Sequence, residues 1–280
     1  MITFPNCKIN IGLQILNRRA DGYHNISTLM YPVDWCDILE ITPSKTGKLI
    51  LNVTGNSVDC PPEKNLVIKA YNAVKQYFNN IPAVEINLHK IIPDGAGLGG
   101  GSADASFTIK MLNELFSLGM DNEKMAQIAK TIGADCPFFI YDTPSFATGI
   151  GDIFTPANID LSQYKILIVK PESAVSTKEA YSGVIPNNDV PELKSLLSHH
   201  ISEWKDTVVN DFEKSLFPNH PEIENVKNML FDLGAVYASM TGSGAAVFGI
   251  FEDEATAKKA SQLFKNLKTH ITHGSSFNNI

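Results

Sequence analysis

The sequence contains Pro93-Asp94-Gly95-Ala96-Gly97-Leu98-Gly99-Gly100-Gly101-Ser102-Ala103-Asp104, a segment with five glycines. Residues 84–90 before it alternate apolar and polar side chains, as a half-buried strand does. After it, apolar residues recur at helical spacing from Ala105 to Leu115. Glycines leave backbone N–H groups open to an anion and permit positive φ, and a helix N-terminus favours negative charge. The sequence therefore predicts a phosphate-binding loop between a strand and a helix.

Two well-known glycine motifs do not fit this segment. A Walker loop ends in Gly-Lys-Ser or Gly-Lys-Thr, but Ser102 follows Gly101 directly and the loop contains no lysine. A dinucleotide fingerprint needs an acidic residue at the end of a strand about 20 positions further on, whereas Asp121 and Glu123 follow a helix pattern. A flexible glycine linker is the remaining alternative, but linkers are rarely flanked by such regular strand and helix patterns.

Composition indicates a globular protein with two medium-sized domains. The chain has 280 residues, of which 44% are hydrophobic and 19% charged. Its net charge of −7 argues against nucleic-acid binding, and no apolar run approaches the roughly 20 residues of a membrane-spanning helix. The N-terminus resembles no signal peptide, so we expect a cytoplasmic protein. Four cysteines, at positions 7, 36, 60 and 136, lack metal-type spacing and are expected to be reduced thiols.

The order of the predicted elements indicates an α+β fold in both domains. Strand patterns dominate the first third, and a helix is expected from about Glu63 and another from an N-cap at Asp121 to a C′ glycine at Gly133. After residue 156 the pattern begins again with a buried strand at 165–170, so we predict domains at 1–156 and 157–280. The second domain is expected to contain helices at 192–204, 222–233 and 255–267, strands at 236–240 and 245–251, and a frayed polar tail.

One acidic residue stands at the predicted end of a helix, in Gly133-Ala134-Asp135-Cys136-Pro137-Phe138-Phe139. A carboxylate there opposes the helix dipole, which makes a purely stabilising role for Asp135 less attractive. The alternative is an ordinary turn aspartate that bonds its own backbone.

Two further segments present polar groups in pairs. Lys8 and Asn10 fall on the same face of an otherwise apolar strand, which could be functional or could be the solvated face of an edge strand. Tyr23 and His24 follow a polar turn, where they could stack on or hydrogen-bond a planar base. An ordinary surface loop is the alternative for that pair.

These segments, in this order and together with Thr241-Gly242-Ser243-Gly244, resemble the GHMP kinase superfamily of galactokinase, homoserine, mevalonate and phosphomevalonate kinases. Within this superfamily, the sequence most resembles a family of kinases of the non-mevalonate isoprenoid pathway. This resemblance is carried by residues 18–24, 97–102, 133–139 and 210–213, so it covers most of the chain.

The resemblance implies an activity and an architecture. It implies ATP-dependent transfer of the γ-phosphoryl group to the 2-hydroxyl of 4-diphosphocytidyl-2-C-methyl-D-erythritol, giving the 2-phosphate and ADP. It also implies a two-domain GHMP kinase fold with the active site in the interdomain cleft, with ATP as co-substrate and Mg²⁺ as its metal.

The resemblance also implies roles for individual residues. Lys8 and Asp135 form the catalytic pair, with Asp135 as base or orienter of the acceptor hydroxyl and Lys8 offsetting the developing charge. Asn10, Tyr23, His24 and Tyr181 face the cytidine substrate. ATP is held by Asn65 and by the glycine loop, Pro93, Asp94, Gly95, Ala96, Gly97, Leu98, Gly99, Gly100, Gly101, Ser102 and Ala103.

Asp94 and Ala103 depart from the usual family pattern, so the Mg²⁺ ligands remain unassigned. Another GHMP kinase, of mevalonate or homoserine type, is the enzymatic alternative, although such acceptors offer Tyr23 and His24 no base to recognise. A non-catalytic nucleotide-binding regulator is the alternative of a different class, against which the presence of both Lys8 and Asp135 argues. We expect small-molecule ligands and a monomer or weak homodimer.

Overall fold

The computed structural model describes residues 1–58 and 60–274. These residues form two compact units, each assembled from separate stretches of the chain. Unit 1 comprises residues 1–7, 35–94 and 99–142, and unit 2 comprises residues 8–34, 95–98 and the described residues from 143 onward. The predicted domain boundary near residue 156 assumes that each domain is one continuous stretch of the chain, and it stays a prediction.

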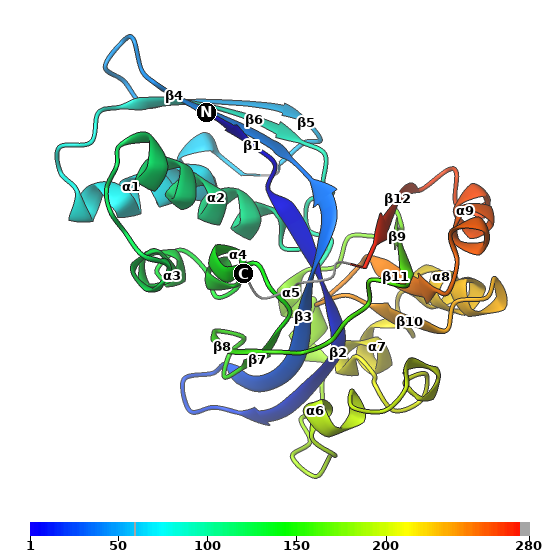
Figure 1. The fold of residues 1–280 in the computed structure, drawn as a ribbon. Helices are drawn as coiled ribbons and strands as arrows, with labels where there is room; N and C mark the ends of the chain where they lie inside the picture. Colours follow the sequence, from blue (N-terminus) through cyan, green and yellow to red (C-terminus); the bar gives the residue numbers. More distant parts are fainter. Residues whose placement is uncertain (59, 275–280) are drawn as a thin grey trace. The chain divides into compact units, whose positions relative to one another are not determined.

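Unit 1 contains a four-stranded sheet with helices α1 and α2 packed on it (Figure 1). The strand order is β1-β4-β6-β5, and β5 and β6 pair in parallel while the other pairs are antiparallel. The elements of this unit are β1 (Ile2–Thr3), β4 (Ile38–Pro43), β5 (Ile50–Gly55), η1 (Pro62–Lys64), α1 (Leu66–Tyr77), β6 (Val84–Lys90), α2 (Gly100–Leu115), α3 (Asn122–Lys130) and α4 (Cys136–Tyr141).

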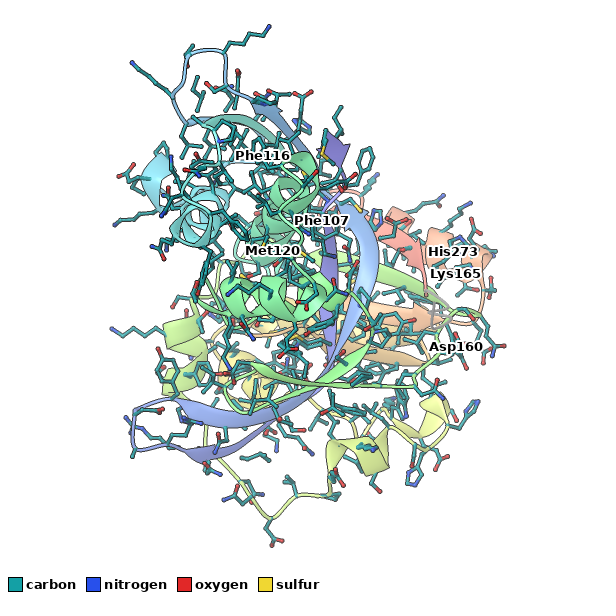
Figure 2. All side chains as sticks on the ribbon, turned by 60° about the vertical axis from the view of Figure 1, so that its left-hand side comes forward. Phe107, Phe116, Met120, Asp160, Lys165 and His273 are labelled. Carbon is teal, nitrogen blue, oxygen red and sulfur yellow. The ribbon has the colours of Figure 1, made fainter. Side chains whose placement is uncertain are left out.

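The core of unit 1 follows the apolar periodicity of the sequence. Val84, Ile86 and Leu88 of β6 are buried and pack in the same cluster as Ala105 and Ile109 of α2. Phe107, Phe116 and Met120 lie on and beside the helices of this unit (Figure 2). The predicted strand, glycine loop and helix around residue 93 are therefore confirmed.

Unit 2 contains most of two four-stranded sheets, in the orders β2-β3-β7-β8 and β10-β11-β9-β12. Helices α8 and α9 pack on the second sheet through a core that includes Val226, Leu230, Ala257 and Ala260. The strands are β2 (Asn6–Arg18), β3 (His24–Cys36), β7 (Ser145–Thr148), β8 (Ile153–Pro156), β9 (Lys165–Lys170), β10 (Tyr237–Met240), β11 (Val247–Phe251) and β12 (Lys268–His273). The helices are α5 (Thr177–Ser182), α6 (Leu193–Leu196), η2 (Ile201–Glu203), α7 (Asp211–Leu216), α8 (Pro221–Asp232) and α9 (Glu254–Leu263).

Several predicted helix bounds are wrong. The long helix expected at 192–204 is only α6 and η2, because the His200 side chain accepts the N–H of Ser202 and begins a separate turn. The last helix ends at Leu263, and residues 268–273 of the expected frayed tail form the edge strand β12, which pairs with β9 along its whole length. The end of that predicted tail, residues 275–280, lies outside the described residues. Ile271 of β12 packs against the unit 2 core and stabilises this edge.

The α+β fold class is confirmed. Among the described residues, no helix is both long and apolar enough to cross a membrane.

Candidate functional site

The glycine loop leads directly from β6 into α2. Gly95, Gly97 and Gly99 have φ angles of 59°, 76° and 73°, the left-handed conformation that glycine adopts most readily. Among the described residues no side chain caps α2, and its first turn carries no acidic residue. The first N–H groups of α2 therefore have the arrangement that suits an anion, while phosphate binding itself stays a prediction.

A pocket of about 230 Å³ lies beside this loop within unit 1. Three of the predicted ATP-binding residues, Asn65, Asp94 and Gly101, contribute to its wall. Asn65 also caps α1, because its Oδ1 accepts the N–H of Val67 at 3.1 Å. The other lining residues are Val58, Cys60, Lys64, Leu66, Leu88, Lys90 and Asp104. Apolar walls with a few charged groups are typical of a small-molecule site.

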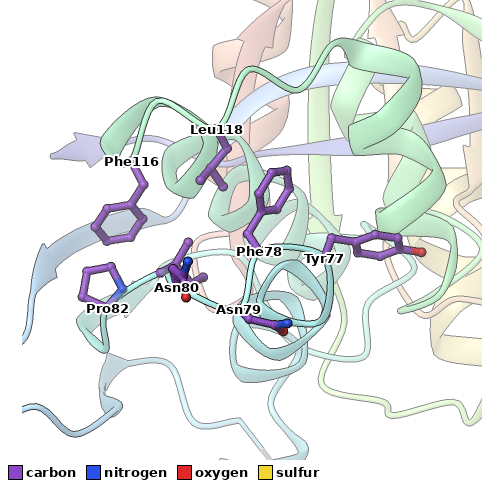
Figure 3. Close-up of a pocket in the computed structure, with 8 residues that line it drawn as sticks. Tyr77, Phe78, Asn79, Asn80, Pro82, Phe116 and Leu118 are labelled. Atoms are coloured by element: carbon purple, nitrogen blue, oxygen red, sulfur yellow. The ribbon is translucent and has the colours of Figure 1, made fainter.

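A second pocket of unit 1, of about 590 Å³, lies at the end of α1 (Figure 3). It is lined by Tyr77, Phe78, Asn79, Asn80, Ile81, Pro82, Phe116 and Leu118. The described residues that line it include no lysine, arginine or acidic side chain with which to hold a triphosphate.

Three charged side chains are buried together in unit 1. Lys90 Nζ donates to Asp104 Oδ2 at 2.7 Å and to Asp37 Oδ2, and Asp37 Oδ1 accepts the N–H groups of Ile91 and Ile92. Burial raises the pKa of Asp104 to about 7 against the opposing charge of Lys90, and the nearby Asp37 adds to the rise. Burial acts to lower the pKa of Lys90, but the charges of Asp104 and Asp37 raise it.

This buried group is absent from the sequence predictions, although one signal for it was available. In the alternating segment 84–90, Lys90 occupies the phase of the buried residues Val84, Ile86 and Leu88. A lysine on the buried face of a strand needs an acidic partner, which the pattern alone does not locate.

Asp135 lies in unit 1 at the N-terminus of α4, where it is half-buried. The prediction that it ends a helix is wrong, because α3 ends at Lys130 and a new helix begins at Cys136, immediately after Asp135, with Pro137 in its first turn. The neighbouring Cys136 is tied to α2, since Ser106 Oγ donates to the Cys136 carbonyl at 2.6 Å and approaches the Ser102 carbonyl at 2.9 Å. Asp135 is thereby fixed next to the first turns of α2.

Lys8 and Asn10 are buried side by side in unit 2, so the solvated edge-strand alternative is wrong for them. Lys8 Nζ donates to Asn10 Oδ1 at 2.6 Å and to the Gly97 carbonyl at 2.9 Å. Asn10 N donates to Thr241 Oγ1 at 3.0 Å, and Asn10 Nδ2 donates to Thr28. The lysine is therefore held against the glycine loop. Its proposed partner Asp135 belongs to the other unit, and their pairing stays a prediction.

The turn at residues 241–244 packs against the glycine loop within unit 2. Thr241 Oγ1 lies 3.2 Å from the Gly97 carbonyl oxygen, and a Cβ at Gly97 would lie only 2.1 Å from the Thr241 carbonyl oxygen. Only glycine fits at position 97 for this reason. Thr241 was part of the family resemblance but not of the predicted site.

The segment Asn210-Asp211-Phe212-Glu213 fixes this turn. Asn210 Nδ2 donates to the carbonyl groups of Met240 and Gly242, at 2.8 and 2.9 Å. Glu213 Oε1 accepts the N–H of Met240 at 2.8 Å. Side chains at the start of α7 thus hold the backbone on either side of Thr241.

The structure brings together two of the residues predicted to meet cytidine. The rings of His24 and Tyr181 stack at 5.0 Å with an angle of 21°, and Tyr181 packs edge-on against Phe212 at 4.8 Å. Tyr23, next to His24 in the chain, is 61% exposed. These aromatic rings form a surface in unit 2 suited to stacking on a planar base.

The chain is similar to known proteins in sequence and in structure. The GHMP kinases N terminal domain matches residues 65–143, and the GHMP kinases C terminal domain matches residues 186–266. A mevalonate kinase of Methanococcus jannaschii is similar in structure, with a TM-score of 0.75 and 16% identity over 99% of this chain and 98% of that one. The fold and the two matched regions define a GHMP kinase.

Two further comparisons narrow the family. A 4-diphosphocytidyl-2-C-methyl-D-erythritol kinase of Parabacteroides distasonis is 52% identical over 261 residues, which is 93% of this chain and 95% of that protein. The crystal structure of a 4-(cytidine 5'-diphospho)-2C-methyl-D-erythritol kinase matches with a TM-score of 0.84 and 29% identity, over 99% of this chain and all of that one. The chain belongs to the family of 4-diphosphocytidyl-2-C-methyl-D-erythritol kinases.

Proposed function

We propose that this protein transfers the γ-phosphoryl group of ATP to the 2-hydroxyl of 4-diphosphocytidyl-2-C-methyl-D-erythritol, in the non-mevalonate route to isoprenoid precursors. The observation that carries the proposal is the 52% identity to a kinase of that name over 93% of the chain. The buried Lys8 and the uncapped glycine-rich helix start support the same chemistry.

In the proposed reaction the acceptor oxygen forms a bond to the γ-phosphorus and the bond to the β-phosphate oxygen breaks, so that ADP leaves. The N–H groups at the start of α2 bind phosphate oxygens, and Asn65 with its pocket binds the nucleoside. Asp135 orients the acceptor hydroxyl and takes its proton as the new bond forms. Lys8, held by Asn10 and Gly97, offsets the charge that develops on the transferred group.

The cytidine end of the acceptor is assigned to the aromatic residues Tyr23, His24 and Tyr181. Stacked His24 and Tyr181 rings support this assignment, because a pyrimidine offers a flat face of similar width.

Mg²⁺ is expected to arrive with ATP, where phosphate oxygens supply most of its ligands. Within residues 1–58 and 60–274, no group of three or more His, Cys, Asp or Glu side chains could hold a metal ion, so we assign no protein ligand to it. The Mg²⁺ requirement, the cytoplasmic location and the monomeric or weakly dimeric state stay predictions.

A coupled ADP-release assay with three acceptors tests the proposal. We expect turnover with 4-diphosphocytidyl-2-C-methyl-D-erythritol and little with mevalonate or homoserine. Preferred turnover of mevalonate or homoserine would contradict the proposed substrate. Nucleotide binding without turnover of any acceptor would instead favour a regulator.

A further inference from the structure

The buried group of Lys90, Asp37 and Asp104 is assigned no step of the reaction proposed above. Their exposed fractions are 4%, 0% and 2%. Lys90 is the last residue of β6, Asp37 precedes β4, and Asp104 lies in the second turn of α2. Burying three charges is costly unless they are well paired, so the arrangement requires an explanation beyond packing.

The three side chains fix both ends of the glycine loop. At its entry, Asp37 Oδ1 accepts the N–H groups of Ile91 and Ile92, at 2.5 and 2.9 Å. At its exit, Asp104 of α2 accepts from Lys90 Nζ at 2.7 Å. Since Lys90 also donates to Asp37, a single ammonium group connects the backbone before the loop to the helix after it.

Lys90 also lies close to the start of the helix. A Cβ at Gly100, the first residue of α2, would lie 3.3 Å from Lys90 Nζ and 3.0 Å from Ile92 Cγ2. The ammonium group therefore lies near the same turn whose N–H groups are assigned to phosphate. Lys90 and Asp104 further line the pocket that contains Asn65.

We propose that Lys90 is a positioning residue for the nucleotide: by joining Asp37 to Asp104, it sets the placement of the first turn of α2 relative to β6. The inference rests on the proposed function, in which that turn binds the phosphates of ATP. It predicts that loss of Lys90 weakens nucleotide binding and leaves the cytidine acceptor largely unaffected.

The test compares two variants that differ only at Lys90. Removing Lys90 alone would leave two buried carboxylates without a cation, so Asp104→Asn is compared with the double variant Lys90→Met/Asp104→Asn. Isothermal titration with ADP is expected to show about tenfold or more weaker binding by the double variant, which lacks a charge-assisted contact. The KM for ATP should rise in parallel, while the KM for the cytidine acceptor changes by less than about twofold.

Lys258→Met is the control, because it removes a lysine from the exposed Lys258–Glu254 pair of α9, and its ADP affinity should equal that of the wild type. Equal ADP affinity of the single and double variants would overturn the inference. So would a parallel loss of affinity for ADP and acceptor, which indicates general damage to the fold.

If the double variant does not fold, Gly100→Ala serves instead, since its Cβ would lie 3.0 Å from Ile92 Cγ2 and 3.3 Å from Lys90 Nζ and leaves every charge in place. Unchanged ADP affinity of that variant would overturn the inference. The titration also separates the two proposals. If the wild type binds ADP and does not phosphorylate the cytidine acceptor, the proposed function is refuted. The role of Lys90 in ADP binding is still decided by the affinities of the single and double variants.

Discussion

Asp135 lies next to α2 because its neighbour in the chain, Cys136, is bonded to that helix. It makes no side-chain cap to α4, while Ser106 of α2 holds the carbonyl of the next residue, Cys136. A carboxylate kept near the glycine-rich helix start has the position expected of a group that orients an acceptor hydroxyl.

Replacing Asp135 by Asn should slow phosphoryl transfer by about 100-fold or more, the usual range for a proton-transfer group, and should leave ADP binding intact. Single-turnover kinetics and ADP titration measure the two effects. Asp160→Asn, at an exposed turn of unit 2, is the matched control and should not change either quantity. Unchanged turnover of the Asp135 variant would remove this residue from the mechanism.

The aromatic residues of unit 2 allow a second test at this scale. Tyr23→Ala and His24→Ala should raise the KM for the cytidine acceptor by about tenfold, the effect of losing one stacked base contact, and change the KM for ATP little. Steady-state kinetics with each substrate varied in turn gives both constants. Tyr77→Ala, which removes another exposed aromatic ring, is the control. An equal rise for both substrates would contradict the assignment.

At the scale of helices and strands, local signals in the sequence acted as expected wherever one side chain determines a boundary. Asp121 caps α3, accepting the N–H of Lys124 at 2.7 Å, and the alternation in β6 places its apolar residues in the core. The predicted helix end at Gly133 is wrong, because α3 already ends at Lys130 and the next helix, α4, begins at Cys136.

The parts of the fold that local sequence patterns did not predict depend on contacts between distant segments. Strand β12 forms by pairing with β9, whose residues lie 98 to 108 positions earlier in the chain. No local pattern in the polar sequence of β12 predicts this pairing. The same holds for the candidate site. Lys8 and Asn10 were predictable as a pair on one strand, whereas their contact with Gly97 and Thr241 depends on how the sheets fold. Lys90 gave a local signal, but its partners Asp37 and Asp104 lie on other elements.

The Asp121 cap provides a stability test. Asp121→Ala should lower the free energy of unfolding by about 1 kcal/mol, since one N–H at the start of α3 loses its acceptor. Denaturant titration measures the change. Asp232→Ala, at the exposed C-terminal residue of α8, should alter stability by less than about 0.5 kcal/mol. Equal effects of the two substitutions would refute a capping role.

The buried carboxyl between β6 and α2 predicts a pH dependence. The pKa of Asp104 is raised to about 7 in the folded protein, so between about pH 4 and pH 7 the folded state holds a proton that the unfolded state has released. The stabilising contribution of Asp104 is therefore complete below about pH 4 and is lost as the pH rises through 7. Asp104→Asn has no such titration.

Thermal unfolding of the wild type and of Asp104→Asn across this range measures the difference. The midpoint of the variant should rise relative to that of the wild type between pH 5 and pH 8. A constant difference would show that Asp104 ionises in the folded protein as it does in the unfolded chain.

At the scale of the whole molecule, nucleotide binding should stabilise the folded chain. A ligand at 100 times its dissociation constant adds about 2.7 kcal/mol to the free energy of unfolding, which corresponds to a rise in Tm of about 5 °C for a protein of this size. Differential scanning fluorimetry with ADP measures the shift, and mevalonate without nucleotide is the control. No shift at saturating ADP would contradict a nucleotide site.

The path of the chain has a practical consequence for protein engineering. The backbone passes from one compact unit to the other after residues 7, 34, 94, 98 and 142. A chimera of two homologous enzymes joined at a single crossover therefore inherits at least one unit with mixed parentage. Exchanging either unit intact requires several simultaneous junctions, including one before and one after the four-residue insert 95–98. Recombination libraries for this scaffold are therefore best designed with several breakpoints placed at these crossings.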